Sequence, residues 1–391
     1  MLDLAALRAD TPGCRDGVFL DSAGSSLPPG PVLEEVIGHL RREAEVGGYR
    51  AAQERADDLE AGYRVFADLL GCDPEDVAFT DSATRSWLSL VDAVPIGPGD
   101  RVLIGEAEYG ANAVALLRLA EHNGATVDTV PSDADGALSV AALRAALDER
   151  VRLVSLVHAP TNSGLVNPVR EVVDAAHEAG ALVLLDACQS VGQLPVRMDA
   201  TGVDMLSGTG RKWLRGPRGT GFLAVRRAAA ERLRPRLVDH SGAPWESPGT
   251  YRLRSDARVH QLWEYGVAER LGLIAAARYA LGLGEEEIAA AVADRATRLR
   301  AGLAALPGVT VHDIGREHSG IVTFTRDGVP AEATVAELRE RRVTVTASTA
   351  GSTRIDMARR GLDGVVRASP HYFVSPDDVD RALAAVAATA G

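Results

Sequence analysis

The chain has 391 residues, of which 46% are hydrophobic and 25% are charged, and its formal net charge is −12. This balance is typical of a soluble globular protein with a sizeable core, and the acidic charge argues against nucleic acid as a partner. No apolar stretch is long enough to span a bilayer, and the first residues lack the basic start and apolar core of a secretion signal. Cys14, Cys72 and Cys188 have unrelated spacings that form neither a disulfide framework nor a zinc motif. We therefore expect a cytoplasmic protein without a metal site or a membrane contact.

Short apolar runs alternate with helical segments in the first two thirds of the chain. The runs predict buried strands at 77–80, 101–104, 151–157, 181–186, 204–207 and 221–225, with helices at 86–93, 111–122 and 169–179. Such alternation predicts an α/β domain with a mostly parallel sheet covered on both faces. Sites in these sheets lie at the carboxyl ends of the strands. Five candidate residues follow such ends: Thr84, Tyr109, His158, Asp186 and Lys212.

The composition changes after about residue 255. Helical periodicity at 261–281 and 285–306 leads into strands at 310–312 and 320–325, a helix at 331–341, strands at 343–346 and 365–369, and a last helix from Pro376. This order predicts a smaller α+β domain. We expect residues 1–20 to pack with the small domain, 21–255 to form the large domain, and 256–391 to form the small one, with a helical connection over about 256–290.

Lys212 stands among glycines, hydroxyls and arginines between residues 204 and 221. A lysine close to backbone donors and a phosphate-binding cation is suited to form a Schiff base with an aldehyde cofactor, although most loop lysines are simply exposed. Asp186 ends an apolar run, where a buried carboxylate needs a cation or a strong donor. Its two interpretations are a cap for the following helix and a partner for a protonated pyridine nitrogen.

Asp186, Gln189 three residues later and Lys212 some two dozen residues further on resemble a known pattern. From residue 21 to residue 372 the chain is similar to class V, fold-type I enzymes that depend on pyridoxal 5′-phosphate (PLP). This family includes cysteine desulfurases, isopenicillin N epimerase-like proteins and related lyases. The resemblance implies a large domain with a mostly parallel seven-stranded sheet, a smaller α+β domain, and a homodimer with its active site at the subunit interface.

The resemblance also implies a role for each matching residue around the cofactor. Lys212 would form the Schiff base, Asp186 would hold the ring nitrogen, and Gln189 would donate to the phenolate oxygen. Tyr109 stands where desulfurases stack a histidine over the ring, although a packed aromatic side chain is equally expected from the residues alone. The loop at residues 82–84 opens a helix, and free amides at a helix start favour an anion. The same loop is also compatible with an ordinary capping turn. The phosphate site implied by the resemblance consists of Ser82, Ala83, Thr84, Thr209 and Arg211.

Four further residues are expected on the substrate side. Arg367 matches the arginine that binds the substrate carboxylate in a bidentate pair, and Thr161 and Asn162 match the loop that assists it. Tyr49 follows a Gly–Gly turn and is expected either to line the substrate channel or to pack in the core. His158 ends a strand, and we expect a structural or supporting role for it.

One departure from the desulfurases narrows the expected function. Their attacking cysteine lies on a segment that here spans residues 343–353 and contains no cysteine, so a persulfide mechanism is not expected. Residues 45–49, 105–112 and 211–219 resemble hercynylcysteine sulfoxide lyase and lincosamide-pathway enzymes that act on cysteine S-conjugates. The resemblance predicts a PLP-dependent C–S β-lyase for an amino acid with a bulky sulfur substituent, releasing a thiol, pyruvate and ammonia. Decarboxylation coupled to oxidative deamination, transamination and epimerisation are the alternatives.

Overall fold

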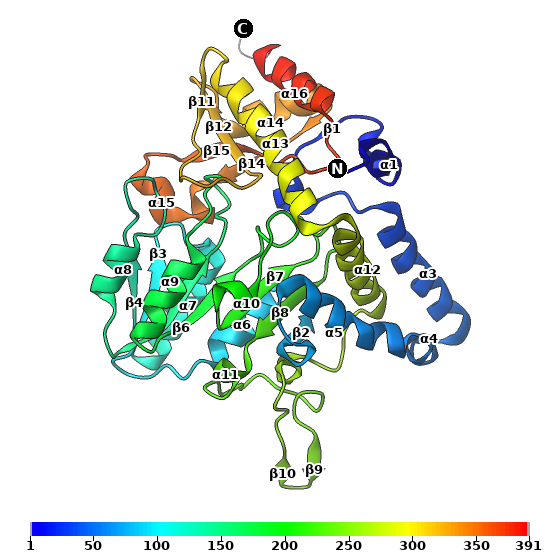
Figure 1. Cartoon of the computed structure of the whole chain (residues 1–391), viewed down its shortest axis with the longest axis vertical. Helices are drawn as coiled ribbons and strands as arrows, with labels where there is room; N and C mark the ends of the chain where they lie inside the picture. The colour runs from blue at the N-terminus through cyan, green and yellow to red at the C-terminus, as the bar shows by residue number, and fades with distance from the viewer. Residues whose placement is uncertain (1, 389–391) are drawn as a thin grey trace.

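The computed structural model describes residues 2–388 and contains a large sheet below a smaller one in the view of Figure 1. The large sheet has seven strands in the order β2-β8-β7-β6-β5-β3-β4. Only β8 runs antiparallel to its neighbours, and the other adjacent pairs are parallel. The predicted fold class is therefore confirmed. The strands are β2 (Val77–Thr80), β3 (Arg101–Gly105), β4 (Thr126–Val130), β5 (Val151–Val157), β6 (Leu182–Asp186), β7 (Met205–Thr209) and β8 (Gly221–Val225).

Both faces of the large sheet are buried, as expected for parallel strands with helical crossovers. In β6, Val183 and Leu185 belong to one hydrophobic cluster, whereas Leu182 and Leu184 belong to a second one. This alternation follows from the two-residue period of a strand. The crossover helices are α6 (Ala83–Ala93), α7 (Gly110–Asn123), α8 (Val140–Ala146), α9 (Val169–Glu178) and α10 (Met198–Thr201), and α11 (Arg227–Ala230) follows β8.

A second group of helices packs beside the large sheet. The N-terminal helices α3 (Gly30–Val46), α4 (Gly48–Glu54) and α5 (Ala56–Leu70) lie next to α12 (Val267–Leu283) (Figure 1). The predicted helix at 261–281 begins six residues late, because residues 261–266 are extended and Gly266 precedes the first turn. Instead, the Gln261 side chain accepts from the backbone N–H of Phe79 at 3.0 Å. A hairpin of β9 (Trp245–Ser247) and β10 (Thr250–Tyr251) projects from this side.

The small sheet is antiparallel, in the order β11-β12-β15-β14. Its strands are β11 (Val309–Val311), β12 (Val322–Arg326), β14 (Thr346–Thr349) and β15 (Gly364–Ala368), and α13 (Glu285–Ala304), α14 (Ala331–Glu340), α15 (Arg354–Arg359) and α16 (Pro376–Ala388) accompany them. Near the N-terminus, β1 (Val18–Phe19) pairs in parallel with β13 (Val343–Thr344), and Arg8 on α1 (Leu4–Ala9) forms an ion pair with Asp378. The predicted domain boundaries stay a prediction, and residues 1 and 389–391 of those ranges lie outside the described chain.

Candidate active site

The carboxyl edge of the large sheet faces the small sheet, and the predicted site residues gather there. Asp186 ends β6, Thr209 ends β7, and Lys212 follows three residues later. From the other side, β15 contributes Arg367. This placement follows from the topology, because parallel strands bring their carboxyl ends to one edge.

Asp186 is a buried carboxylate held by neutral donors. Its Oδ2 accepts from the side-chain amide of Asn112 on α7 at 2.9 Å, and its Oδ1 accepts from the backbone N–H of Cys188 at 3.0 Å. The side chain is 6% exposed, and within residues 2–388 no cation forms an ion pair with it. A carboxylate in such surroundings favours a positively charged partner, and a protonated pyridine nitrogen would supply one.

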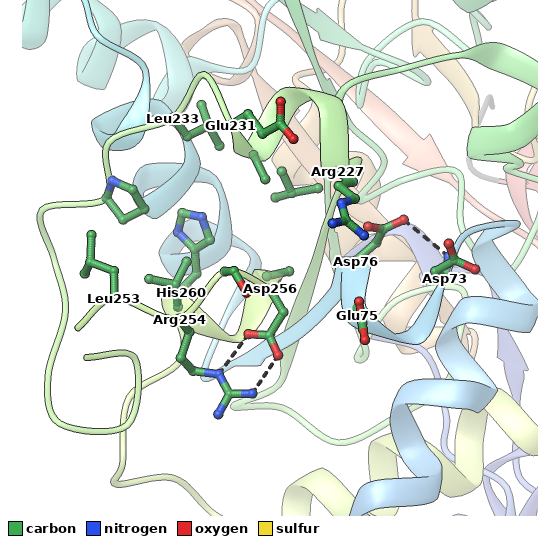
Figure 2. Close-up of a pocket in the computed structure, with 16 residues that line it drawn as sticks. Asp73, Glu75, Asp76, Arg227, Glu231, Leu233, Leu253, Arg254, Asp256 and His260 are labelled. Carbon is green, nitrogen blue, oxygen red and sulfur yellow. Dashed lines mark hydrogen bonds and ion pairs between the residues drawn. The ribbon is translucent and has the colours of Figure 1, made fainter. Parts of the chain in front are cut away.

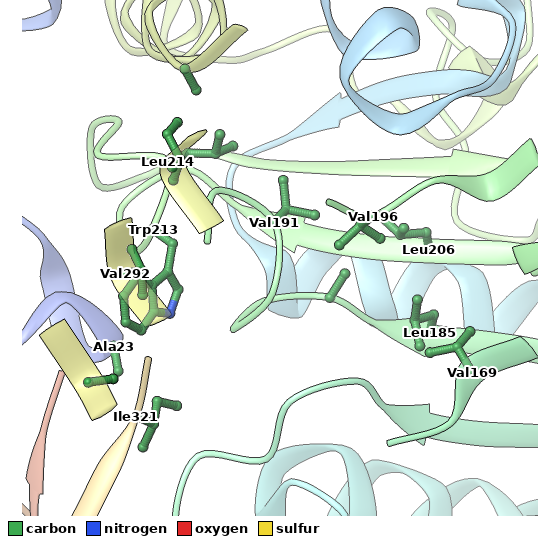
Figure 3. Packing of buried hydrophobic residues seen from close by; sticks show 14 of the residues in the cluster. Ala23, Val169, Leu185, Val191, Val196, Leu206, Trp213, Leu214, Val292 and Ile321 are labelled. Carbon is green, nitrogen blue, oxygen red and sulfur yellow. The ribbon is translucent and has the colours of Figure 1, made fainter. Parts of the chain in front are cut away.

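Gln189 has its amide orientation fixed by the residue after the lysine. The indole N–H of Trp213 donates to Gln189 Oε1 at 2.9 Å, so the Nε2 end is the donor. Nε2 donates to the carbonyl of Ala23 at 3.0 Å and to Thr161 Oγ1 at 3.4 Å. Figure 3 shows the buried Trp213 ring beside Ala23 and Ile321, so packing between the two sheets holds this donor in place.

Lys212 combines a low pKa with a free amine. Burial lowers the pKa of its ammonium group, because the charged form loses its hydration, and Arg211 and Arg367 lower it further against the opposing effects of Cys188 and Asp186. No hydrogen bond of the described residues engages its Nζ. A neutral, unengaged amine is the form that attacks an aldehyde. Lys212 is also the only lysine in the sequence, a signal that strengthens the assignment.

The first turn of α6 offers backbone donors for an anion. Ser82 caps the helix, its Oγ accepting from the N–H of Arg85 at 3.2 Å, which leaves the amides of Ala83 and Thr84 open. Gly221 pairs with Thr80 on one side and Thr209 on the other. A Cβ at Gly221 would lie 2.2 Å from the carbonyl carbon of Ser82, so only glycine lets the loop approach this closely.

Thr209 lies beside this loop, and the side chains of both Thr209 and Arg211 are engaged with backbone carbonyls. Thr209 Oγ1 donates to the carbonyl of Thr220 at 3.3 Å, and Arg211 Nη1 donates to the carbonyl of Gly24. Thr209 adjoins the Ser82 loop through Gly221. Together these donors and a guanidinium suit a phosphate group.

Arg367 is the cation on the substrate side. Its Nη1 donates to Thr161 Oγ1, and its Nη2 lies 3.4 Å from Oδ1 of Asp21. Its Nε is buried and has no partner among the described residues. Burial lowers the pKa of the guanidinium. An incoming carboxylate would satisfy the open donor.

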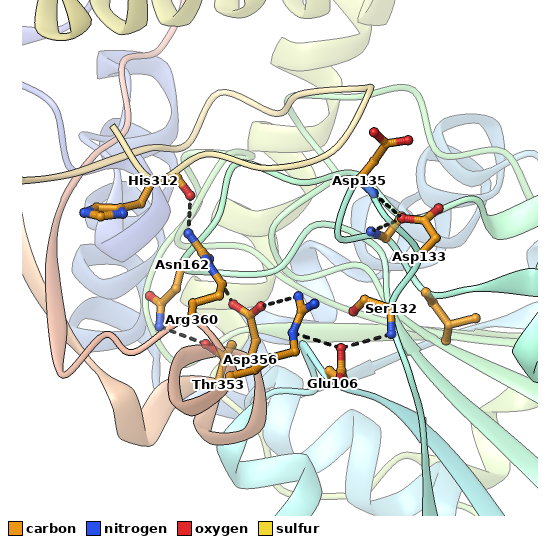
Figure 4. A network of polar contacts seen from close by, with 12 residues as sticks. Glu106, Ser132, Asp133, Asp135, Asn162, His312, Thr353, Asp356 and Arg360 are labelled. Carbon is orange, nitrogen blue, oxygen red and sulfur yellow. Dashed lines mark hydrogen bonds and ion pairs between the residues drawn. The ribbon is translucent and has the colours of Figure 1, made fainter. Parts of the chain in front are cut away.

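The Asn162 side chain binds residues in and after β14 instead of assisting Arg367. Its Nδ2 donates to Thr353 Oγ1 at 3.1 Å and its Oδ1 accepts from Ser348, so it fixes the segment that follows β14 (Figure 4). Of the two neighbouring residues predicted to assist the arginine, Thr161 is the one that contacts it.

Of the remaining predicted residues, Tyr49 stands apart from this cluster, whereas Tyr109 and His158 lie beside it. Tyr49 is 83% exposed on α4, its ring 6.1 Å from that of Trp263, and Tyr109 is 41% exposed at the start of α7. The core alternative is therefore wrong for Tyr49, and the stacking role of Tyr109 stays a prediction. His158 is buried, which lowers its pKa to about 4, and its backbone N–H donates to the carbonyl of Asp186 at 3.0 Å. These contacts give His158 a supporting place beside the acid.

A pocket at the opposite edge of the sheet holds none of the candidates. Figure 2 shows it between the start of β2 and the end of β8, where Arg254 and Asp256 form an ion pair.

The sequence did not point to Asn112 or Glu108, which lie four residues apart and meet behind Asp186. Their spacing was the available signal.

A lysine amine, an acid without a cation and open amides together fit an aldehyde cofactor with a protonated ring nitrogen and a phosphate. This geometry defines a PLP-dependent enzyme of fold-type I.

Comparison with known proteins agrees with the assignment to the PLP-dependent enzymes of fold-type I. The chain belongs to the aminotransferase class-V family, whose profile matches residues 18–382. It is 33% identical to probable cysteine desulfurase 2 of Mycobacterium leprae, covering 98% of this chain and 96% of that protein. It is 34% identical to the probable hercynylcysteine sulfoxide lyase of Mycobacterium tuberculosis, covering 96% and 91%.

A solved structure shows the same fold. The lyase C-DES, crystallised as a lysine-to-alanine mutant with glycine covalently linked to its PLP cofactor, superposes with a TM-score of 0.89 at 24% identity and covers 99% of both chains. PLP is the cofactor that the class-V family and the donor set of this chain imply, as the sequence predicted.

Proposed function

We propose that this chain is a PLP-dependent C–S β-lyase that acts on a cysteine bearing a bulky sulfur substituent and releases a thiol, pyruvate and ammonia. The single observation that carries the proposal is the convergence of the half-buried Lys212 with the buried Asp186 and Arg367 where the two sheets meet. The similarity to proteins named as a cysteine desulfurase and a hercynylcysteine sulfoxide lyase supports carbon–sulfur chemistry.

Bound PLP would supply an electron sink for the electron pair left when the Cα–H bond of the substrate breaks. Arg367 binds the substrate carboxylate through its open donors. Lys212, whose pKa burial lowers, takes the Cα proton on Nζ. Asp186 would hold the proton of the ring nitrogen, and Gln189 Nε2 would donate to the ring oxygen. The Cβ–S bond then breaks, the sulfur leaves as a thiol, and water releases pyruvate and ammonia.

The cysteines of the chain favour elimination over desulfuration. Residues 343–353 contain none, Cys14 is buried, and Cys72 follows α5. Cys188 adjoins Asp186, and burial raises the pKa of its thiol well above the usual value, so the thiolate form is disfavoured. No thiolate is therefore provided to attack the substrate sulfur.

The test is to incubate the PLP-loaded protein with a series of S-substituted cysteines. Thiol, pyruvate and ammonia should appear in equal amounts, and a Lys212→Arg variant should form none of them. Consumption of the conjugate without pyruvate or thiol would contradict the proposal. An aldehyde with carbon dioxide and hydrogen peroxide would favour oxidative deamination.

We also propose that the protein is a homodimer in the cytoplasm. Tyr49 and Trp263 are 83% and 47% exposed and contact one another, an apolar surface of the kind that packs against a partner. The three cysteines are free thiols, in keeping with a reducing compartment. Within residues 2–388 no helix is long and apolar enough to cross a bilayer.

A further inference from the structure

Glu108 is a buried carboxyl group to which the proposed reaction assigns no task. It lies between β3 and α7 and is 4% exposed. Its Oε1 accepts from the backbone N–H of Tyr109 at 2.8 Å and from Asn112 Nδ2 at 3.0 Å, and its Oε2 accepts from Ser155 Oγ at 2.8 Å. In the described part of the chain it has no cationic partner, so stability does not explain its position.

The Asn112 amide bridges two carboxyl groups. Its Nδ2 donates to Glu108 Oε1 at 3.0 Å and to Asp186 Oδ2 at 2.9 Å. The amide carries two hydrogens on nitrogen and none on oxygen, whereas ionised carboxylates only accept. A flipped amide would place its oxygen against both carboxyl groups. Because Glu108 Oε1 also accepts from the backbone N–H of Tyr109, the oxygen that faces Asn112 is an acceptor, and this favours the Asn112 orientation that donates to Asp186.

We propose that Glu108 is a positioning residue for the cofactor, which acts through Asn112 to hold the Asp186 carboxylate in the orientation that binds the ring nitrogen. The inference rests on the proposed function, because it needs a cofactor with a protonated ring nitrogen. With one oxygen held by Asn112 and the other by the N–H of Cys188, the carboxylate plane is fixed on both sides. Removing the Glu108 side chain frees the Asn112 amide to rotate, so one oxygen of the Asp186 carboxylate is held less firmly.

The experiment measures the Kd of PLP and the visible absorption maximum of the bound cofactor in Glu108→Gln, Glu108→Ala, Asn112→Ala and the double variant Glu108→Ala/Asn112→Ala. Glu108→Gln keeps an acceptor for Asn112 and should bind PLP as the wild type does. Glu108→Ala and Asn112→Ala should each raise Kd about tenfold and shift the absorption maximum equally. The double variant should be no weaker than either single one, because both act through one contact.

Glu106→Gln is the matched control. Glu106 lies on the same turn, accepts from the N–H of Ser132 at 2.9 Å and lies 3.2 Å from Arg359, and it contacts neither Asn112 nor Asp186 (Figure 4). Its loss should leave the Kd of PLP unchanged. If Glu108→Ala does not fold, Glu108→Met, which keeps the volume without the acceptor, replaces it.

An unchanged Kd in Glu108→Ala, or a double variant about a hundredfold weaker, would overturn the role of Glu108. Failure of the wild-type protein to bind PLP would instead overturn the proposed function. If the wild type binds PLP and has lyase activity while the Glu108 variants bind PLP equally well, only the positioning role of Glu108 is removed.

Discussion

Burial shifts the pKa values of Lys212 and of Glu108, the carboxyl group behind Asp186, in opposite directions. It lowers the pKa of the Lys212 ammonium, and it raises the pKa of the Glu108 carboxyl to about 7 from an ordinary value of 4.5. In each case the neutral form gains, because a buried charge loses its hydration. For the lysine the neutral form is the nucleophile, so burial prepares it for reaction with an aldehyde. With no second lysine in the sequence, that reaction has one side chain available.

The raised pKa of Glu108 predicts a pH dependence of stability. The folded state binds this proton more tightly than the unfolded state, so the contribution is fully present below pH 4.5 and is lost as the pH rises through about 7. The 2.5-unit difference corresponds to about 3 kcal/mol. The wild-type apo protein should therefore lose about 3 kcal/mol more stability than Glu108→Gln between pH 4.5 and 8 in urea unfolding. Parallel curves for the two proteins would refute the assignment.

At the scale of elements, the proposed phosphate cradle, formed by the open amides of Ala83 and Thr84, depends on the close approach of β8 to the start of α6. Gly221→Ala should push the Ser82 loop away, since the added Cβ would meet the Ser82 backbone at 2.2 Å. We expect the affinity for PLP to fall at least about tenfold, one lost hydrogen bond to phosphate costing about 1.5–3 kcal/mol. Gly249→Ala, at a glycine with nothing within 4 Å of its added Cβ, is the control and should bind PLP normally. Equal Kd values for the two variants would contradict this view of the cradle.

Elements with a strong apolar run could be predicted from the sequence, and elements without one could not. The central strand β6 is apolar up to Asp186, and its boundary was found almost to the residue. The strand β4 was missed because Thr126 and Asp128 interrupt its apolar pattern, which an edge strand with a single neighbour tolerates.

The same reasoning separates the site residues. Lys212, Asp186 and Gln189 lie near strand ends, where local sequence indicates a site. Asn112 meets Asp186 across 74 positions of sequence, and the contact exists because the first turn of α7, which follows β3, lies beside the carboxyl end of β6. Glu108 contacts Asn112 locally, but its place behind Asp186 depends on the same contact between elements. Local patterns find strand ends, whereas contacts between elements require the fold.

At the scale of the whole molecule, the site is built where the two sheets meet. Arg367 of the small sheet contacts Thr161, in the loop after β5, and Asp21 of the N-terminal segment, so relative movement of the sheets would displace its guanidinium. The N-terminal segment also pairs with β13. In the proposed function, substrate binding at Arg367 is therefore coupled to the packing of the small sheet.

The proposed dimer gives a test at the same scale. Trp263→Ser removes the ring that contacts Tyr49 and should weaken association, because large aromatic side chains dominate such interfaces. Light scattering should give about twice 41.1 kDa for the wild type and a mass closer to 41.1 kDa for the variant at low concentration. Leu117→Ser, at an exposed position of α7, is the control. A wild-type protein that stays monomeric at every concentration would exclude the dimer.

The most direct measurement is the site of covalent PLP attachment. The PLP-loaded protein is reduced with borohydride, digested, and mapped by mass spectrometry. We predict one cofactor per chain, on the peptide that contains Lys212, and none in Lys212→Arg. Attachment only at the N-terminal amine, or no attachment, would contradict Lys212 as the cofactor anchor.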